Sequence, residues 1–457
     1  MAKELHVVFV PYFTPSHMIP LVNIARLFAS RHGVKVSIIT THYNALFFES
    51  SIDESGQQIF VHKLKFPSDE VGLPQGIENF SSVTASEMSL LFMGIALLQK
   101  PMEDLIVELS PHCIVSDVCL TWTVDVAEQL KVSSDSESFL IPGLPNKIEM
   151  KRSQLPENIK TNPEGPYWEM MKRIKESEPR SYAMIHDTIY DLESTYAELY
   201  QKIKGKKPWL IGPLFYFSKR EESSNSRNTA VQERHSCLSW LDSQEPNSVV
   251  YICFGSMGRF SDAQLTEIAL ALEASDSSFL WVVRNGDKTQ ENDQKNWMPT
   301  SFKGKMLTNN KGLIVRGWVP QLKILNHPAI GAFMTHCGWN SILESLTAGV
   351  PMLTWPLFAE QFYNEKLVEV LGCGVGVGAE VCHSTFDITD TIVKKENIEA
   401  SVKMLMNASK KSETTRSRAK DVEATIKRAV EKGGSSYNHL TALIAELKCH
   451  VFGTLKE

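Results

Sequence analysis

The fold is decided by residues 330–349, which read IGAFMTHCGWNSILESLTAG. Ile330–Met334 is an apolar run with the length of a buried strand, and it is followed by a helix that ends near Ala348 and Gly349. A strand that turns directly into a helix is the building unit of a parallel α/β sheet. The turn at 336–341 therefore lies at the carboxyl end of a strand, where open α/β sheets bind ligands.

The same alternation of strands and helices continues on both sides of this unit. Further strand-like runs lie at Val249–Phe254, Phe279–Val283, Leu313–Val315 and Met352–Thr354. Ser261-Asp-Ala-Gln264 has the pattern of a capping box and opens a helix with one apolar face. We therefore expect a doubly wound domain over residues 237–435.

The first half of the chain repeats this pattern. Leu5–Val10, a helical stripe and Val34–Ile39 form a βαβ unit, and strand-like runs at Cys113–Val115 and Trp209–Ile211 continue the layer. We expect one domain over 1–216 and an exposed polar linker over 217–236. The final helix, within 436–457, has an apolar stripe that could pack on either domain, the first included.

The expected fold class is α/β, with two doubly wound Rossmann-like domains facing across a cleft. A chain of 457 residues is about twice what one hydrophobic core usually organises. Two open sheets placed with their carboxyl ends together leave a cleft between them, so the sequence predicts a site for two substrates.

The composition of the chain limits which kinds of molecule it is expected to bind. The chain is 43% hydrophobic with a formal net charge of −6, which is typical of a globular protein and gives no electrostatic case for nucleic acid or an acidic membrane. The eight cysteines form no C-x-x-C pair, and neither a signal peptide nor a membrane span is evident. We expect a cytoplasmic protein with reduced thiols, small-molecule partners and, by default, a monomeric state.

The most informative stretch covers residues 318–361. It begins Trp318-Val-Pro-Gln, contains His336-Cys-Gly-Trp-Asn-Ser and ends Trp355-Pro-Leu-Phe-Ala-Glu-Gln. It resembles the signature box of plant family 1 UDP-glycosyltransferases, and the similarity extends over nearly the whole chain. The resemblance implies a fold of the GT-B type, an acceptor bound by the N-terminal domain and a UDP-sugar bound by the C-terminal domain. The terminal Gln361 implies glucose rather than galactose as the sugar.

The chemistry of these residues agrees with a donor site. A helix start presents unpaired N–H groups and a positive dipole end, so a diphosphate is stabilised there without a dedicated cation. Gly338 allows close backbone approach, and His336, Asn340 and Ser341 add side-chain donors. Glu344 lies on the same helix face as Asn340 and Ser341 and is suited to accept from two ribose hydroxyls.

The remaining donor contacts concern the base and the sugar. Trp318 offers a flat face on which uracil could stack, with neighbouring main-chain groups reading the base edge. In the family, the positions of Glu360 and Gln361 hold the hexose. The expected UDP-sugar contacts are Ser256, Trp318, Val319, Gln321, His336, Gly338, Trp339, Asn340, Ser341, Glu344, Glu360 and Gln361. Taken alone, Asn340-Ser341 could be a simple helix cap and Glu344 a solvated charge.

Two residues of the first domain form the expected catalytic pair. His17 follows the first strand and precedes a helix, whose positive end keeps the imidazole neutral and able to accept a proton. Asp117 follows the strand at 113–115 and can orient His17 if the two strands are near neighbours. The resemblance assigns both roles. The sequence has no Asp-x-Asp motif, so we expect inverting transfer without a metal ion or other cofactor, with UDP-glucose as the donor substrate.

A weaker alternative is a hydride-transfer enzyme. The run Gly374-Val-Gly-Val-Gly-Ala379 can be matched to the dinucleotide-binding pattern G-x-G-x-x-A. No convincing βαβ unit surrounds it, so a glycine-rich strand or turn is favoured.

The resemblance breaks after Lys131. Relatives continue there with another strand, a Phe-His-Gly-Thr or similar turn and a further helix, whereas this chain passes directly to Phe139-Leu-Ile-Pro-Gly-Leu-Pro. Roughly 30 residues are missing, about one βαβ unit. This leads to a second hypothesis, a shortened variant that binds UDP-sugar but transfers it poorly. The identity of the acceptor does not follow from the sequence.

Overall fold

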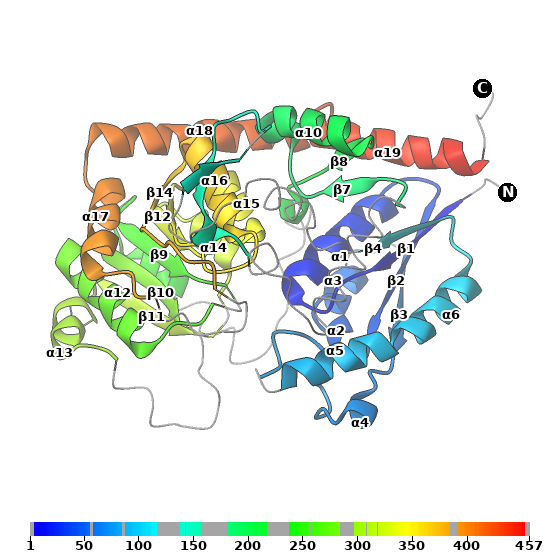
Figure 1. The fold of residues 1–457 in the computed structure, drawn as a ribbon, viewed down its shortest axis with the longest axis horizontal. Helices are drawn as coiled ribbons and strands as arrows, with labels where there is room; N and C mark the ends of the chain where they lie inside the picture. The colour runs from blue at the N-terminus through cyan, green and yellow to red at the C-terminus, as the bar shows by residue number, and fades with distance from the viewer. Residues whose placement is uncertain are drawn as a thin grey trace. The chain divides into compact units, whose positions relative to one another are not determined.

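The computed structural model describes residues 4–54, 58–84, 87–116, 138–141, 143–156, 181–216, 237–255, 258–283, 297–307, 309–317, 319–383 and 391–452. The contacts within the chain divide it into two compact units (Figure 1). Unit 1 comprises Met1–Trp122, Pro163–Ser224 and Arg428–Glu457, and unit 2 comprises Thr123–Asn162 and Asn225–Lys427. The predicted linker at 217–236 lies outside the described residues.

Unit 1 is built on a parallel sheet in the order β3-β2-β1-β4. Its elements are β1 Leu5–Val10, α1 Pro15–Ala29, β2 Val34–Thr41, α2 His42–Ala45, α3 Glu49–Glu54, β3 Ile59–Leu64, α4 Ser68–Val71, α5 Met88–Leu97, α6 Gln99–Leu109, β4 Cys113–Ser116, β7 Met184–His186, α10 Tyr190–Lys204, β8 Pro208–Leu210 and α19 Ser435–Phe452. β7 and β8 form a separate parallel pair. The apolar side chains of β1 and β2 are buried against α1 and the last helix, α19.

Unit 2 contains a six-stranded parallel sheet in the order β11-β10-β9-β12-β13-β14. Its elements are β5 Ser138–Leu140, β6 Glu149–Lys151, the 3-10 turn Arg152–Gln154, β9 Val249–Cys253, α12 Asp262–Ser275, β10 Ser278–Val283, α13 Thr300–Phe302, the π turn Lys303–Leu307, β11 Gly312–Arg316, α14 Gln321–Leu325, β12 Ile330–Thr335, α15 Trp339–Ala348, β13 Met352–Thr354, α16 Gln361–Leu371, β14 Gly374–Gly376, α17 Lys395–Met406 and most of α18 Lys410–Val430.

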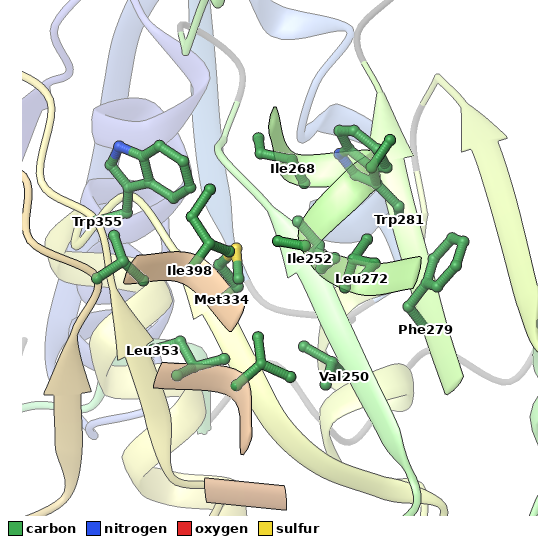
Figure 2. Close-up of a cluster of buried hydrophobic side chains, with 14 of the residues drawn as sticks. Val250, Ile252, Ile268, Leu272, Phe279, Trp281, Met334, Leu353, Trp355 and Ile398 are labelled. Atoms are coloured by element: carbon green, nitrogen blue, oxygen red, sulfur yellow. The ribbon is translucent and has the colours of Figure 1, made fainter. Parts of the chain in front are cut away.

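Both faces of the unit 2 sheet are covered, as a doubly wound fold requires. Val250 and Ile252 of β9 point to the face packed by α12 and α17, where Ile398 joins them (Figure 2). The alternate residues Val249 and Tyr251 belong to a second core on the other face. The α/β alternation predicted from the sequence is therefore present in both units.

One local prediction needs correction, and another, the glycine-rich strand or turn at 374–379, is confirmed. In the predicted capping box, Ser261 Oγ does accept from the Gln264 N–H at 3.3 Å, but the Gln264 side chain binds the backbone of Val393 instead of returning to Ser261. The glycine-rich run begins with β14, an edge strand paired with β13, and continues without a helix over the described residues 377–383. It therefore lacks the strand-turn-helix context of a dinucleotide site.

A second difference concerns the hairpin of β5 and β6, which the sequence placed in the first domain. Met150 and Leu155 pack on Phe362 of α16 and on Cys382, within unit 2. Lys151 Nζ also lies 2.7 Å from Glu380 Oε1. The hairpin is therefore assigned to unit 2 by its buried contacts.

Candidate functional site: a helix start and a histidine

The turn between β12 and α15 is the centre of the candidate donor site in unit 2. Every residue of β12 is buried, and α15 is capped by Gly338, which has no side chain to offer the N–H groups of the first turn. Cys337 has a φ of 64°, which a residue other than glycine rarely adopts, and this turns the chain from the strand into the helix. A positive helix end is thus presented at the carboxyl end of a central strand, an arrangement suited to an anion.

His336 lies between two glycines. A Cβ atom at Gly255 would lie 2.7 Å from His336 Nε2, and one at Gly338 would lie 2.5 Å from it. Burial lowers the pKa of His336 to about 4, so the imidazole is neutral at neutral pH. Its buried Nδ1 atom has no hydrogen-bond partner within the described residues. A neutral imidazole has one donor and one acceptor nitrogen, and its Nε2 atom is the one that lies beside Gly338 at the turn before α15, where a ligand oxygen is expected.

A hydrogen-bonded network joins α14 to α15. Gln321 Nε2 donates to Glu344 Oε2 at 2.6 Å and to Ser341 Oγ at 3.2 Å. The Tyr251 hydroxyl donates to Gln321 Oε1 at 3.0 Å. We call Gln321, Ser341 and Glu344 the donor-site network. The structure thus brings together three residues that the sequence predicted separately.

The two residues expected to hold the hexose differ in their surroundings. Gln361 is only 3% exposed, and its Oε1 atom accepts the backbone N–H groups of Leu357 at 2.9 Å and Phe358 at 3.1 Å. Its amide oxygen therefore holds the loop that precedes α16, which leaves the amide nitrogen for a ligand. Glu360 is half-buried at the N-terminal boundary of α16.

The other expected donor contacts fall into three groups. Trp339 and Asn340 are half-buried in the first turn of α15. The Val319 side chain is buried in a hydrophobic core and its carbonyl accepts from Gln321 N–H at 2.9 Å, so contact with a base would use other main-chain atoms. Trp318 and Ser256 lie outside the described residues.

In unit 1, His17 lies in the first turn of α1, directly after β1 and its connecting loop. Thr14 is the N-cap and its side chain makes no capping bond, while the His17 N–H donates to the Thr14 carbonyl at 3.0 Å. The ring of Tyr12 meets the His17 imidazole edge to face at 5.7 Å and stacks on Phe80 at 5.4 Å. An aromatic wall therefore lies beside the half-buried histidine.

Asp117 itself lies outside the described residues, but the strand before it is described. β4 pairs with β1 in parallel, with Ser116 opposite Val10. The two strands are thus direct neighbours, and the chain leaves both at the same end of the sheet.

Sequence reasoning missed two residues of α16, one that supports the turn before α15 and one that binds the end of β13. Asn364 Nδ2 donates to the Cys337 carbonyl at 2.9 Å, which holds the left-handed residue in place. Glu365 accepts from Thr354 Oγ1 at 2.6 Å, and burial raises its pKa to about 7. Their spacing after Gln361 was the only available signal, and it indicates no more than a helix with polar residues.

The chain is similar in sequence to known proteins. Residues 172–413 match the family described as UDP-glucoronosyl and UDP-glucosyl transferase. The chain is 48% identical to nuatigenin 3-beta-glucosyltransferase of Solanum aculeatissimum, over 98% of each chain. It is 43% identical to solanidine UDP-glucose glucosyltransferase 1 of Solanum tuberosum, over 97% of each.

The chain is also similar in fold to solved structures. The chain matches UGT73P12 of Glycyrrhiza uralensis, complexed with glycyrrhetinic acid 3-O-monoglucuronide, at a TM-score of 0.88 and 38% identity, over 97% of this chain and 96% of that one. UGT71G1 of Medicago truncatula, complexed with UDP-glucose, matches at a TM-score of 0.72 and 27% identity, over 97% and 98%. Among the described helices, none combines the length and the hydrophobicity needed to cross a bilayer.

The alignment with the Solanum aculeatissimum protein also bears on the missing segment. It extends over 487 positions, whereas this chain has 457 residues, so at least 30 positions of that relative have no counterpart here. The predicted break after Lys131 lies outside the described residues.

Proposed function

Because the chain belongs to plant family 1 of the UDP-glycosyltransferases, we propose that it transfers glucose from UDP-glucose to a hydroxyl group of a small apolar plant metabolite. The observation that carries this proposal is the start of α15, where the N-cap residue Gly338 has no side chain to cover the first turn, His336 precedes the helix, and Glu344 follows within it. The helix end binds the diphosphate, and Glu344 accepts from the ribose hydroxyls. The side-chain nitrogen of Gln361 and the carboxylate of Glu360 bind the glucose.

The transfer step uses His17 as a general base. Its imidazole takes the proton from the acceptor hydroxyl, and that oxygen attacks the anomeric carbon as the bond to UDP breaks, which inverts the configuration. Asp117 orients the imidazole and stabilises its positive charge. The negative charge that develops on UDP is stabilised by the start of α15, so no divalent ion is needed.

The surroundings of His17 support an apolar acceptor. The rings of Tyr12 and Phe80 form a wall beside the imidazole, and Phe92 packs edge to face on Phe80 at 5.1 Å. Aromatic faces bind flat or polycyclic hydrocarbon skeletons without specifying a polar pattern. The names of the relatives include a nuatigenin, a solanidine and a flavonoid transferase, which agrees with a flavonoid or terpenoid acceptor.

The test is a mass-spectrometric screen of hydroxyl-bearing plant metabolites with UDP-glucose. We expect glucosides from at least one apolar acceptor, unchanged turnover in the presence of a chelator, and loss of product by at least about a hundredfold in His17→Ala. A metal-dependent rate would contradict the proposed role of the α15 start, and full activity of His17→Ala would contradict its role as base.

The alternative function is UDP-sugar binding with impaired transfer. The 30 or more positions without a counterpart favour it, because that number of residues equals about one βαβ unit. Calorimetric titration with UDP beside the turnover screen separates the two functions. Binding without any glucoside supports the impaired variant, whereas efficient turnover eliminates it.

A further inference from the structure

The hydroxyl group of a core tyrosine reaches the donor-site network. Tyr251 is the third residue of β9, and it is fully buried with its ring stacked on Phe333 of β12 at 4.9 Å. Its ring therefore belongs to the hydrophobic core. Its hydroxyl group, although buried as well, donates to Gln321 Oε1 at 3.0 Å.

The chemistry of Glu344 determines how the Gln321 amide is oriented. A carboxylate only accepts hydrogen bonds, so the Gln321 atom 2.6 Å from Glu344 Oε2 must be the amide nitrogen. The amide oxygen then faces Tyr251, whose hydroxyl must act as the donor. The second hydrogen of the nitrogen is directed to Ser341 Oγ at 3.2 Å. The Gln321 amide thus uses its oxygen and both hydrogens within the protein.

We propose that Tyr251 is a positioning residue for ribose recognition: through Gln321 it holds the Glu344 carboxylate in the orientation that accepts the ribose hydroxyls. This inference rests on the proposed function, in which Glu344 binds the ribose of UDP. The sequence named Gln321 only as a UDP-sugar contact, and this inference gives its side chain the specific task of orienting a carboxylate.

The substitution Tyr251→Phe isolates the hydroxyl group. Phenylalanine retains the ring that stacks on Phe333, so the core loses no volume. Gln321 Oε1 then loses its donor, the amide can rotate, and Glu344 loses a fixed charge-assisted partner. The substitution should therefore weaken the binding of ligands that have ribose hydroxyls and leave the binding of ligands without them nearly unchanged.

The experiment compares two nucleotides by calorimetric titration of the full chain: UDP and 2′,3′-dideoxy-UDP, which lacks both ribose hydroxyls. We expect the wild type to prefer UDP by about tenfold or more, since the ribose hydroxyls of UDP donate to the charged carboxylate of Glu344. In Tyr251→Phe this preference should fall by about fivefold, with the affinity for the dideoxy nucleotide nearly unchanged. Gln321→Leu should give the same loss. Tyr190→Phe is the matched control, because it removes a hydroxyl that binds Glu198 in unit 1.

The outcomes separate this inference from the proposed function. If the wild type binds UDP and Tyr251→Phe keeps the full preference for it, the hydroxyl group only stabilises the core and the inference is wrong. If Tyr251→Phe does not fold, Gln321→Leu decides, and an unchanged preference in that variant overturns the inference. Failure of the wild type to bind UDP would instead overturn the proposed function.

Discussion

One methyl group should be enough to disturb His336. The Cβ atom of an alanine at position 338 would lie 2.5 Å from His336 Nε2, closer than carbon and nitrogen can approach, so the ring or the helix start must move. We expect Gly338→Ala to weaken UDP binding by about tenfold or more, because preorganised donors lose their alignment. Calorimetric titration measures this directly.

The matched control for that substitution is Gly304→Ala. An added Cβ at Gly304 meets nothing within 4 Å, and the residue is exposed in unit 2. UDP affinity should therefore be unchanged. Equal affinities in both variants would mean that the glycine at 338 is not required for donor binding.

A second residue-scale prediction concerns Glu365. Burial raises the pKa of this carboxyl from 4.5 to about 7, so the folded state binds its proton more tightly than the unfolded chain. The stabilisation is complete below about pH 4.5 and is lost as the pH rises through 7. Glu365→Gln removes this titration and keeps an oxygen for Thr354 Oγ1. We expect the variant to be more stable than the wild type by on the order of 2 kcal/mol at pH 8, with little difference at pH 5.

Urea unfolding of both proteins at the two pH values provides the measurement. His336 titrates in both, so its own effect cancels in the comparison. A stability difference that does not change with pH would show that the Glu365 carboxyl is not buried.

At the residue scale, the sequence indicated candidate residues but not their contacts. His336, Gly338 and Glu344 could be proposed as donor-site residues because a helix start after a buried strand has a chemistry of its own. Tyr251 could not, because an aromatic residue within a strand is read as core, and its ring is core. Gln361 could also be proposed as a donor-site residue, but its bonds to two backbone N–H groups depend on the path of a loop that no local pattern specifies.

At the element scale, the β5–β6 hairpin shows which kind of contact holds an element in place. Met150 is 1% exposed within an apolar cluster, whereas the Lys151–Glu380 pair is partly solvated. We expect Met150→Ala to lower the free energy of unfolding by about 2–5 kcal/mol and Lys151→Ala by less than about 1 kcal/mol. Denaturant titration of the two variants checks the order, and an equal loss would contradict it.

The same hairpin marks the limit of prediction for elements. A strand-helix alternation identifies layers, so both parallel sheets could be inferred from runs such as 249–254 and 34–39. The β5–β6 hairpin is not part of such an alternation of strands and helices. Its assignment depends on Phe362 and Cys382, which lie more than 200 positions later in the chain, so only the folded structure assigns it to unit 2.

At the scale of the whole molecule, an exposed apolar residue on the edge strand β4 of unit 1 bears on the missing segment. β4 is the last strand of the described sheet, and the side chain of its Ile114 is 50% exposed although the neighbouring β1 is almost wholly buried. A further strand beside β4 would cover such apolar surface. We expect a variant that carries the corresponding segment of a relative after Lys131 to melt at a higher temperature and to turn over faster.

Differential scanning calorimetry and the acceptor screen test this prediction together. The matched control is an insertion of equal length made of glycine and serine, which adds chain but no apolar surface. A natural segment that performs no better than this control would mean that the shortened chain already forms a complete unit.

The burial of α19 has a consequence for biosynthesis. Leu440, Leu443, Ile444 and Leu447 fill the core of the unit that begins with β1. The nascent chain therefore cannot complete the folding of unit 1 before unit 2 has been translated. Unit 1, which contains the first residues to be translated, keeps part of its hydrophobic core exposed until the C-terminal helix has been synthesised.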